Sequence, residues 1–258
     1  MKVAALTLSW NTLEATKMSV KSTSYELRTL KKSGIDVVHY IVDNGSDDGS
    51  KEWIKNNKKY DYVPIIMNEN TGNSVGRNVV LDRLTDEDYL FMIDSDLVPV
   101  AGTFGAMLEF MEREDNKNIG NFGANYFTIT TELDKTTRRV SKFDKIDNAF
   151  PSGIIQRPKA TDIAFAGYGV FRAKLFTKHS MRFITDGPFT GPGHSGEDDK
   201  LGYDITKAGY KIQRFDDVVY FHNAGSSVRN MKSRGVDPNV QNRINYLIDM
   251  IDRENGLK

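Results

Sequence analysis

Short apolar runs alternate with longer polar segments from the start of the chain to residue 93, and this alternation constrains the fold more than any other feature. The apolar runs are near-continuous, which is the pattern of strands buried on both faces of a parallel sheet. Strands are expected at residues 3–9, 37–42, 63–67 and 89–93, and helices between them at residues 11–30, 48–57 and 74–84. The sequence therefore predicts an α/β fold, with a mostly parallel central sheet and helices on both faces.

The rest of the chain is less regular. We expect helices at residues 102–113, 198–208 and 239–254, strands at 119–130, 162–171, 211–215 and 218–221, and loops at 141–159, 185–196 and 225–237. Residues 185–196 hold four glycines and two prolines, a composition typical of mobile lids. No internal repeat or linker divides the sequence, so residues 1–258 are expected to form a single domain.

Composition excludes several kinds of chemistry. The chain has no cysteine, so it has no disulfide, no thiolate metal site and no cysteine nucleophile. Its 35 basic and 35 acidic residues balance, which gives no overall attraction to nucleic acid or anionic membranes. No basic leader precedes the first strand, and no run approaches the roughly 18 apolar residues of a membrane span. We therefore expect a cytoplasmic protein with no membrane span.

Polar residues follow each of the four strands predicted in the first part of the chain. These four clusters are Ser9-Trp10-Asn11, residues 43–50, residues 68–73 and Asp94-Ser95-Asp96. Because ligands in open α/β sheets bind at the carboxyl ends of the strands, the clusters are expected to share one rim. A single cluster is commonly a surface loop, whereas four on one rim indicate a binding site.

Asp94-Ser95-Asp96 is the most specific of these clusters. Its two carboxylates follow the apolar run at residues 89–93. They can share a divalent cation, or one can hold the cation while the other binds a ribose. Mg²⁺ and Mn²⁺ favour carboxylate oxygens, and substrate phosphates often complete Mg²⁺ sites. A bound Mn²⁺ or Mg²⁺ is therefore expected.

A second acidic cluster, Glu197-Asp198-Asp199, follows the glycine-rich loop and opens a predicted helix. Acidic residues stabilise a helix N-terminus through its dipole, but a carboxylate here can also act as general base toward an acceptor hydroxyl. His222 follows a predicted strand, where it is either structural or a further ligand for a cation held by carboxylates. His39 lies inside a predicted strand and is expected to pack.

Together these residues resemble the motifs of the GT-A glycosyltransferases, especially inverting family 2, from residue 2 to about residue 227. Ser9-Trp10-Asn11 is similar to the family's Thr-Tyr-Asn, although Leu8 replaces the usual preceding proline. Residues 42–50 resemble its Asp-x-x-Ser-x-Asp-Gly-[Ser/Thr] segment, and residues 70–78 its Asn-x-Gly…Ala-Arg-Asn helix entry. Asp94-Ser95-Asp96 is similar to its Asp-x-Asp, and residues 165–172 to the strand beneath its acceptor site. Residues 196–199 resemble its Glu-Asp motif and the Gly-Glu-Asp-Asp of β-1,4-galactosyltransferases.

The resemblance implies a role for each motif. The implied donor-binding residues are Ser9, Trp10, Asn11, Asp43, Asn70, Gly72, Arg77, Asp94 and Ser95. Of these, Asp43 would contact the uracil. The implied metal ligands are Asp96, His222 and Asp94, and the implied acceptor-binding residues are Gly167, Tyr168 and Glu197. The implied catalytic residues are Asp198, as general base, and Glu197. Residues 1–100 would form the nucleotide-sugar-binding half, residues 101–225 the acceptor-binding half, and residues 226–258 a C-terminal tail.

The implied reaction is a single displacement that inverts the anomeric carbon. It moves a sugar from a nucleotide sugar to an acceptor hydroxyl, and UDP-sugars are the expected donors. One alternative is a sugar-phosphate nucleotidyltransferase, although the glycine-rich phosphate loop of such enzymes does not follow the first strand here. The other is a noncatalytic carbohydrate- or nucleotide-binding protein on the same fold. The acceptor stays open among a glycan, a lipid-linked sugar, a protein and a hydroxymethylated DNA base. Two locally basic segments, at residues 138–145 and 229–243, bear on the DNA alternative.

Overall fold

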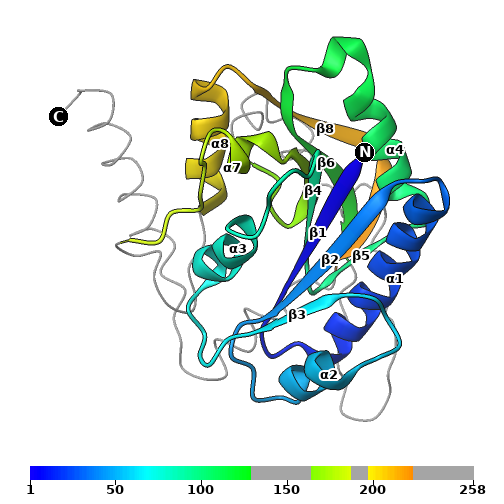
Figure 1. Cartoon of the computed structure of the whole chain (residues 1–258), viewed down its shortest axis with the longest axis vertical. Helices are drawn as coiled ribbons and strands as arrows, with labels where there is room; N and C mark the ends of the chain where they lie inside the picture. Colours follow the sequence, from blue (N-terminus) through cyan, green and yellow to red (C-terminus); the bar gives the residue numbers. More distant parts are fainter. Residues whose placement is uncertain (129–163, 187–196, 223–258) are drawn as a thin grey trace.

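The computed structural model describes residues 1–128, 164–186 and 197–222 (Figure 1). Within these ranges, eight strands form one sheet in the order β3-β2-β1-β4-β7-β6-β8-β5. The strands are β1 (Lys2–Ser9), β2 (Asp36–Asp43), β3 (Val63–Ile66), β4 (Tyr89–Asp94), β5 (Leu97–Pro99), β6 (Ile119–Thr128), β7 (Tyr168–Arg172) and β8 (Lys211–His222). The helices are α1 (Leu13–Lys32), α2 (Ser50–Asn56), α3 (Asn73–Leu81), α4 (Thr103–Glu112), α7 (Lys174–Thr177) and α8 (Glu197–Lys207), with a 3-10 turn at Glu114–Asn116.

The first half of the sheet is parallel. Strand β1 runs parallel to both β2 and β4, and β2 runs parallel to β3. The register places Ser9 opposite Asp43 and Leu8 opposite Asp94. The carboxyl ends of β1, β2 and β4 therefore lie side by side, and the expectation of a shared rim is confirmed.

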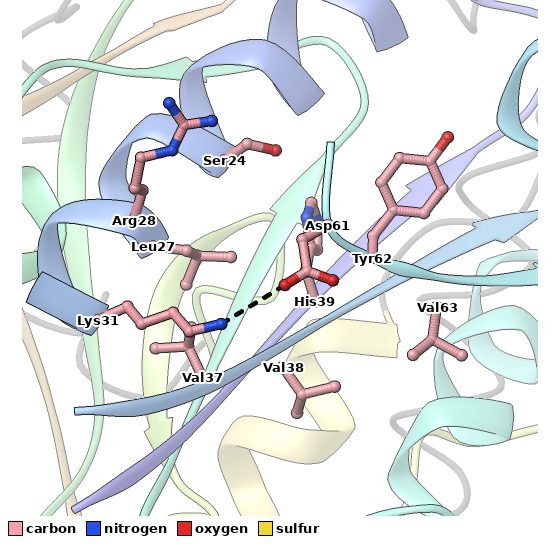
Figure 2. Close-up of a pocket in the computed structure, with 10 residues that line it drawn as sticks. All are labelled: Ser24, Leu27, Arg28, Lys31, Val37, Val38, His39, Asp61, Tyr62 and Val63. Atoms are coloured by element: carbon pink, nitrogen blue, oxygen red, sulfur yellow. Dashed lines mark ion pairs between the residues drawn. The ribbon is translucent and has the colours of Figure 1, made fainter. Parts of the chain in front are cut away.

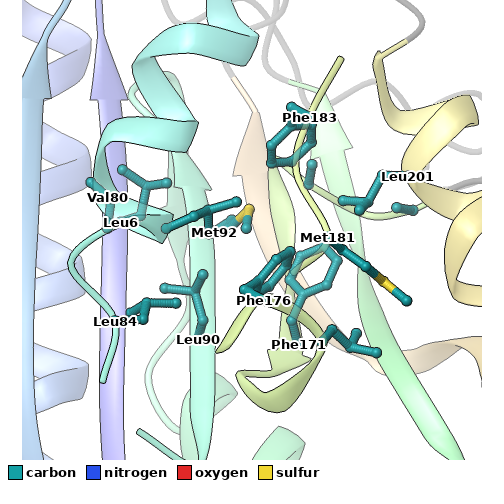
Figure 3. Close-up of a cluster of buried hydrophobic side chains, with 14 of the residues drawn as sticks. Leu6, Val80, Leu84, Leu90, Met92, Phe171, Phe176, Met181, Phe183 and Leu201 are labelled. Carbon is teal, nitrogen blue, oxygen red and sulfur yellow. The ribbon is translucent and has the colours of Figure 1, made fainter. Parts of the chain in front are cut away.

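The core lies on both faces of this sheet. On β1, Ala4, Leu6 and Leu8 pack in one apolar cluster with residues of α3, α7 and α8, part of which Figure 3 shows. The alternate residues Val3 and Ala5 pack on the opposite face with residues of α1 and α4. Figure 1 shows the same division, with the sheet between the two groups of helices. Both faces of β1 are thus buried, as its near-continuous apolar run predicts.

The second half of the sheet is mixed. Strand β7 pairs antiparallel with both β4 and β6, and β5 pairs antiparallel with β8, whereas β6 and β8 are parallel. The strand predicted at residues 119–130 corresponds to β6. The two strands predicted at 211–215 and 218–221 form the single strand β8, whose pairing with β6 has a register shift between Ala124 and Asn125.

The strand predicted at residues 162–171 was placed too early, since β7 begins only at Tyr168. Residues 164–166 are apolar and buried, but they do not form a strand. The backbone N–H of Phe165 donates to the side-chain oxygen Oδ1 of Asn121 (2.7 Å). That of Ala164 donates to the carbonyl of Asp198 (3.1 Å). These backbone groups are therefore satisfied outside the sheet ladder.

Several predictions lie outside the described residues: the loops at 141–159 and 225–237, the helix at 239–254, both basic segments at 138–145 and 229–243, and residues 187–196 of the glycine-rich loop. In the described ranges, no helix is both long enough and apolar enough to cross a membrane.

Candidate active site

Asp43 ends β2 inside the rim. It is fully buried, and its Oδ2 accepts a hydrogen bond from the backbone N–H of Ser46 (3.0 Å). Its Oδ1 is also buried and has no hydrogen-bond donor among the described residues. Burial raises the pKa of the Asp43 carboxyl, and hydrogen bonds from Ser46 oppose that shift. A buried acceptor oxygen with no donor suits a ligand that brings an N–H.

The loops after β1 and β2 are joined by Asn11, which has a positive φ of 51°. Its backbone N–H donates to the Ser46 hydroxyl (3.0 Å), and its Oδ1 accepts from the backbone N–H of Asp47 (2.8 Å). Trp10 is partly exposed beside it. The hydroxyl of Ser9, in contrast, is buried against that of Thr16 on α1 (2.8 Å). Ser9 therefore reaches the rim with its backbone, while its side chain belongs to the interior.

Asn44 organises the loop between β3 and α3, a role that the sequence interpretation missed. Its Nδ2 donates to Oδ1 of Asn70 (3.0 Å) and to the carbonyl of Gly72 (3.1 Å). Its Oδ1 accepts from both the backbone N–H and the hydroxyl of Thr71. The predicted donor residues Asn70 and Gly72 are thus fixed to the end of β2. The signal was present, since Asn44 follows Asp43 directly in the motif at residues 42–50.

Arg77 on α3 connects the two acidic clusters and is only 3% exposed. Its Nη2 lies 2.9 Å from Oδ1 of Asp94, and its Nη1 lies 2.8 Å from Oε1 of Glu197 and 3.6 Å from Oδ1 of Asp198. We refer to Arg77, Asp94, Glu197 and Asp198 as the Arg77 cluster. The structure therefore brings together β4 and the first turn of α8, which are about 100 residues apart in the sequence.

The pKa values in the Arg77 cluster reflect three acids around one base. Desolvation alone would lower the pKa of Arg77, but the charges of Asp94, Asp198 and Glu197 raise it above its ordinary value. Desolvation raises the pKa of the Asp94 carboxyl, and Arg77 opposes this. The pKa of Asp198 is well above its usual range because of desolvation and the neighbouring charge of Glu197. The cluster remains net negative when its carboxyls are ionised.

Gly167 lets the backbone approach Asp94 closely. Its carbonyl accepts the backbone N–H of Asp94 (2.9 Å). A Cβ on Gly167 would lie 2.4 Å from Oδ2 of Asp94. Tyr168, partly buried, begins β7 immediately afterwards. The two predicted acceptor residues therefore lie beside the Asp-x-Asp segment.

Ser95 faces inward and fixes this segment from the other side. It is 4% exposed, and its hydroxyl pairs with that of Thr12 (2.8 Å), while its backbone N–H donates to the carbonyl of Leu8 (3.2 Å). Asp96 follows as a partly buried residue. Ser95 thereby acts as an internal anchor between the two acidic residues.

The backbone brings His222 to the same segment, because it pairs with Leu97, the residue after Asp96. Its side chain lies outside what the structure describes. Among the side chains that are described, no group of three or more acids or histidines is arranged to hold a metal ion. Asp94 and Asp96 nevertheless supply the hard oxygen ligands that Mn²⁺ and Mg²⁺ prefer. The charge of Asp96 also raises the pKa of Asp94, and a divalent cation would relieve that repulsion.

A separate cavity of about 290 Å³ lies between α1, the first half of β2 and the segment leading into β3 (Figure 2). Its lining includes Leu27, Lys31, His39 and Tyr62, and an ion pair joins Lys31 to Asp61 (3.6 Å). None of the predicted site residues lines it. Since it adjoins the amino-terminal half of β2, it is distinct from the rim.

The family model of glycosyl transferase family 2 matches residues 18–179, more than half of the chain. The chain therefore belongs to glycosyl transferase family 2. No curated protein matches its sequence.

Solved structures confirm the GT-A fold. A mannosyltransferase, PcManGT from Pyrobaculum calidifontis in complex with GDP-Man and Mn²⁺, has a TM-score of 0.60 and 15% identity over 86% of this chain. S. aureus TarS 1-349 in complex with UDP-GlcNAc has the same score, identity and coverage of this chain. GalNAc-T7 with UDP, GalNAc and Mn²⁺ has a TM-score of 0.62 and 11% identity over 86%. The chain spans 56%, 58% and 44% of the lengths of these three structures.

Proposed function

We propose that this protein is a metal-dependent, inverting glycosyltransferase that moves a sugar from a nucleotide sugar to an acceptor hydroxyl. The observation that carries the proposal is the convergence of Asp94 and the Glu197–Asp198 pair on Arg77, at the carboxyl rim of a family 2 fold. The similar structures hold GDP-Man, UDP-GlcNAc or UDP. UDP-sugars are the expected donors, because the resemblance to the family motif implies that Asp43 contacts the uracil.

The nucleoside would bind between the ends of β1 and β2. The buried Oδ1 of Asp43 would accept the uracil N–H, which supplies the donor that the described residues lack. Trp10 and Asn11 would lie beside the base, on the loop that Asn11 fixes to Ser46. Asn70 and Gly72 would border the donor from the loop that Asn44 holds.

Asp96, Asp94 and His222 would hold the Mn²⁺ or Mg²⁺ ion beside the donor diphosphate. The bound cation would neutralise the negative charge that develops on the leaving nucleoside diphosphate. Two carboxylates on one short segment favour this use, and the backbone pairing of His222 with Leu97 supports the third ligand. Ser95 would keep the two acids in register through its buried hydroxyl.

Asp198 would remove the proton from the acceptor hydroxyl. Its side chain is 32% exposed, whereas that of Glu197 is 5% exposed and its Oε1 is paired with Arg77. Asp198 is therefore the more accessible of the two to an acceptor. Glu197 would orient the site by hydrogen bonds, and Gly167 and Tyr168 would border the acceptor. Attack opposite the leaving group would invert the anomeric carbon.

The first experiment screens UDP- and GDP-sugars for release of the nucleoside diphosphate with Mn²⁺, and then supplies acceptors of each class with the best donor. Asp198→Asn retains the shape of the side chain but removes its basicity. We expect it to lower transfer by at least about 10²-fold, because a positioned base contributes about 10²–10⁴-fold. Donor binding should be unchanged.

Asp199→Asn is the matched control, since adjacent helical residues point about 100° apart. It should have much less effect on transfer. A product that keeps the donor's anomeric configuration, or an Asp198→Asn variant with most of its transfer rate, would contradict the inverting general-base mechanism.

A further inference from the structure

The guanidinium of Arg77 is held in one orientation by its surroundings. The ring of Phe183 lies 5.2 Å from its central carbon. Phe183 is itself fixed to α3, because its backbone N–H donates to Oδ1 of Asn78 (2.9 Å) and its carbonyl accepts from Nδ2 of the same residue (2.8 Å). Arg77 belongs to α3, and the Phe183 ring that packs against it is held to the same helix by hydrogen bonds.

Each end of the guanidinium faces a different element. Nη2 pairs with Asp94 at the end of β4, while Nη1 pairs with Glu197 and lies near Asp198 in the first turn of α8. Asn73, in the first turn of α3, also donates to Oε1 of Glu197 (3.3 Å). The planar fork of arginine suits such simultaneous pairing, whereas a lysine is a point charge that cannot reproduce it.

Without Arg77, the three carboxylates of the cluster would repel one another. They share the positive charge of Arg77, and both Glu197 and Arg77 are almost fully buried, where charges interact strongly. Loss of the guanidinium would therefore loosen the first turn of α8 from the end of β4. That turn carries the proposed base, while the end of β4 carries part of the proposed metal site.

We infer that Arg77 is a positioning residue, which sets the first turn of α8 against the Asp-x-Asp segment, and that it is not a contact to the nucleoside. This inference rests on the proposed transfer reaction and assigns Arg77 a role different from the donor-binding one that the family resemblance implies. Its burial and its three carboxylate neighbours direct the guanidinium to the protein itself.

The test compares Arg77→Lys with Arg172→Lys. Arg172 is a second buried arginine, but it bonds to the Tyr89 hydroxyl and to the carbonyls of Ile119, Met111 and Asn116. Turnover is measured with the best nucleotide sugar, and uridine affinity by calorimetry. Hydrogen exchange is followed at the backbone amides of α8. Arg77→Met repeats the measurements with no charge at this position.

We expect Arg77→Lys to lower kcat about 100-fold, the loss typical of a displacement of about 1 Å at a reacting centre. Uridine affinity should stay at the wild-type value, and exchange should accelerate in α8 but not in β1. Arg172→Lys should cause no selective change in α8.

A fall in uridine affinity that matches the fall in kcat/KM would overturn the inference, because Arg77 would then contact the nucleoside. Unchanged kcat and unchanged α8 exchange in both Arg77 variants would also overturn it. If the wild-type protein transfers no sugar, the proposed function fails, whereas the exchange experiment still tests whether Arg77 positions α8.

Discussion

The absence of a side chain at Gly167 leaves room for the Asp94 carboxylate. The Asp94 carboxylate occupies the space where a Cβ would lie, 2.4 Å from Oδ2. We expect Gly167→Ala to displace the carboxylate, lower kcat/KM and weaken Mn²⁺ binding, measured by steady-state kinetics and metal titration.

Gly105→Ala is the matched control, because a Cβ there meets no atom within 4 Å and Gly105 lies inside α4. It should leave kinetics unchanged and stabilise the fold by about 0.5–1 kcal/mol, the usual gain on replacing a helical glycine by alanine. Equal kinetics for the two variants would show that Asp94 does not need the space beside Gly167.

His39 is buried, as the sequence predicts for a histidine that packs within a strand. It is 2% exposed, its Nε2 lies 2.9 Å from the Thr7 hydroxyl, and burial lowers its pKa to about 3. The unfolded chain binds a proton at this residue near pH 6.5, whereas the folded protein does not. Stability is therefore lost as the pH falls below about 6.5, by up to about 1.4 kcal/mol per pH unit.

His39→Gln tests this pH dependence by urea unfolding. The free energy of unfolding of the wild type should fall, relative to that of the variant, by about 2 kcal/mol between about pH 7 and about pH 5. The charged groups lining the same cavity, Arg28, Lys31 and Asp61, are common to both proteins. Parallel pH profiles for the two proteins would refute a neutral buried His39.

At the scale of the elements, α4 depends on a residue of α1. Glu26 is 2% exposed, and its two carboxylate oxygens accept the backbone N–H groups of Gly102 and Phe104, both at 2.9 Å. The first N–H groups of a helix have no partner within the helix, and a negative charge there also interacts favourably with the helix dipole. Glu26 thus caps α4 from across the interface.

Glu26→Gln removes the charge and replaces one acceptor by a donor. We expect it to lower the free energy of unfolding by about 1–3 kcal/mol, since a buried N–H loses its partner. Urea denaturation of Glu14→Gln provides the comparison, because Glu14 on the same helix has a 75% exposed side chain and forms an exposed ion pair with Lys17. If the two variants have equal stability, α4 does not need Glu26 as a cap.

The elements show what a sequence pattern can and cannot predict. Strands β1, β2 and β4 were placed within one or two residues, because each is buried on both faces and reads as an apolar run. Strand β5 was missed, since Leu97–Pro99 is too short to show a period and its partner β8 is remote in sequence. Residues 164–166 were misassigned because burial alone does not distinguish a strand from a buried turn.

At the scale of the whole molecule, topology explains which part of the geometry of the candidate site could be predicted from the sequence and which part could not. The rim follows from local patterns, because parallel strands must end together. The Arg77 cluster does not, since its members lie on three elements and only side-chain geometry shows that Arg77 faces Asp94 and Glu197. Sequence order therefore predicted which loops share the rim of the sheet, but not which side chains connect the two acidic clusters.

The last prediction concerns a nucleotide bound along the rim, as proposed above. A ligand that binds only the folded chain stabilises it by an amount that grows with its concentration, about 2.7 kcal/mol at 100 times Kd. We expect uridine alone, and UDP with Mn²⁺ more strongly, to raise the melting temperature, measured by calorimetry. EDTA should remove the Mn²⁺-dependent part of the stabilisation and stop transfer.

Asp96→Asn should lose only the Mn²⁺-dependent part of the stabilisation, whereas Asp43→Asn should lose the response to uridine as well. Asp82→Asn should respond like the wild type, because Asp82 caps the end of α3 opposite the rim and pairs there with Arg182. A full Mn²⁺ response in Asp96→Asn would show that the cation binds elsewhere, and a full uridine response in Asp43→Asn would place the nucleoside away from β2.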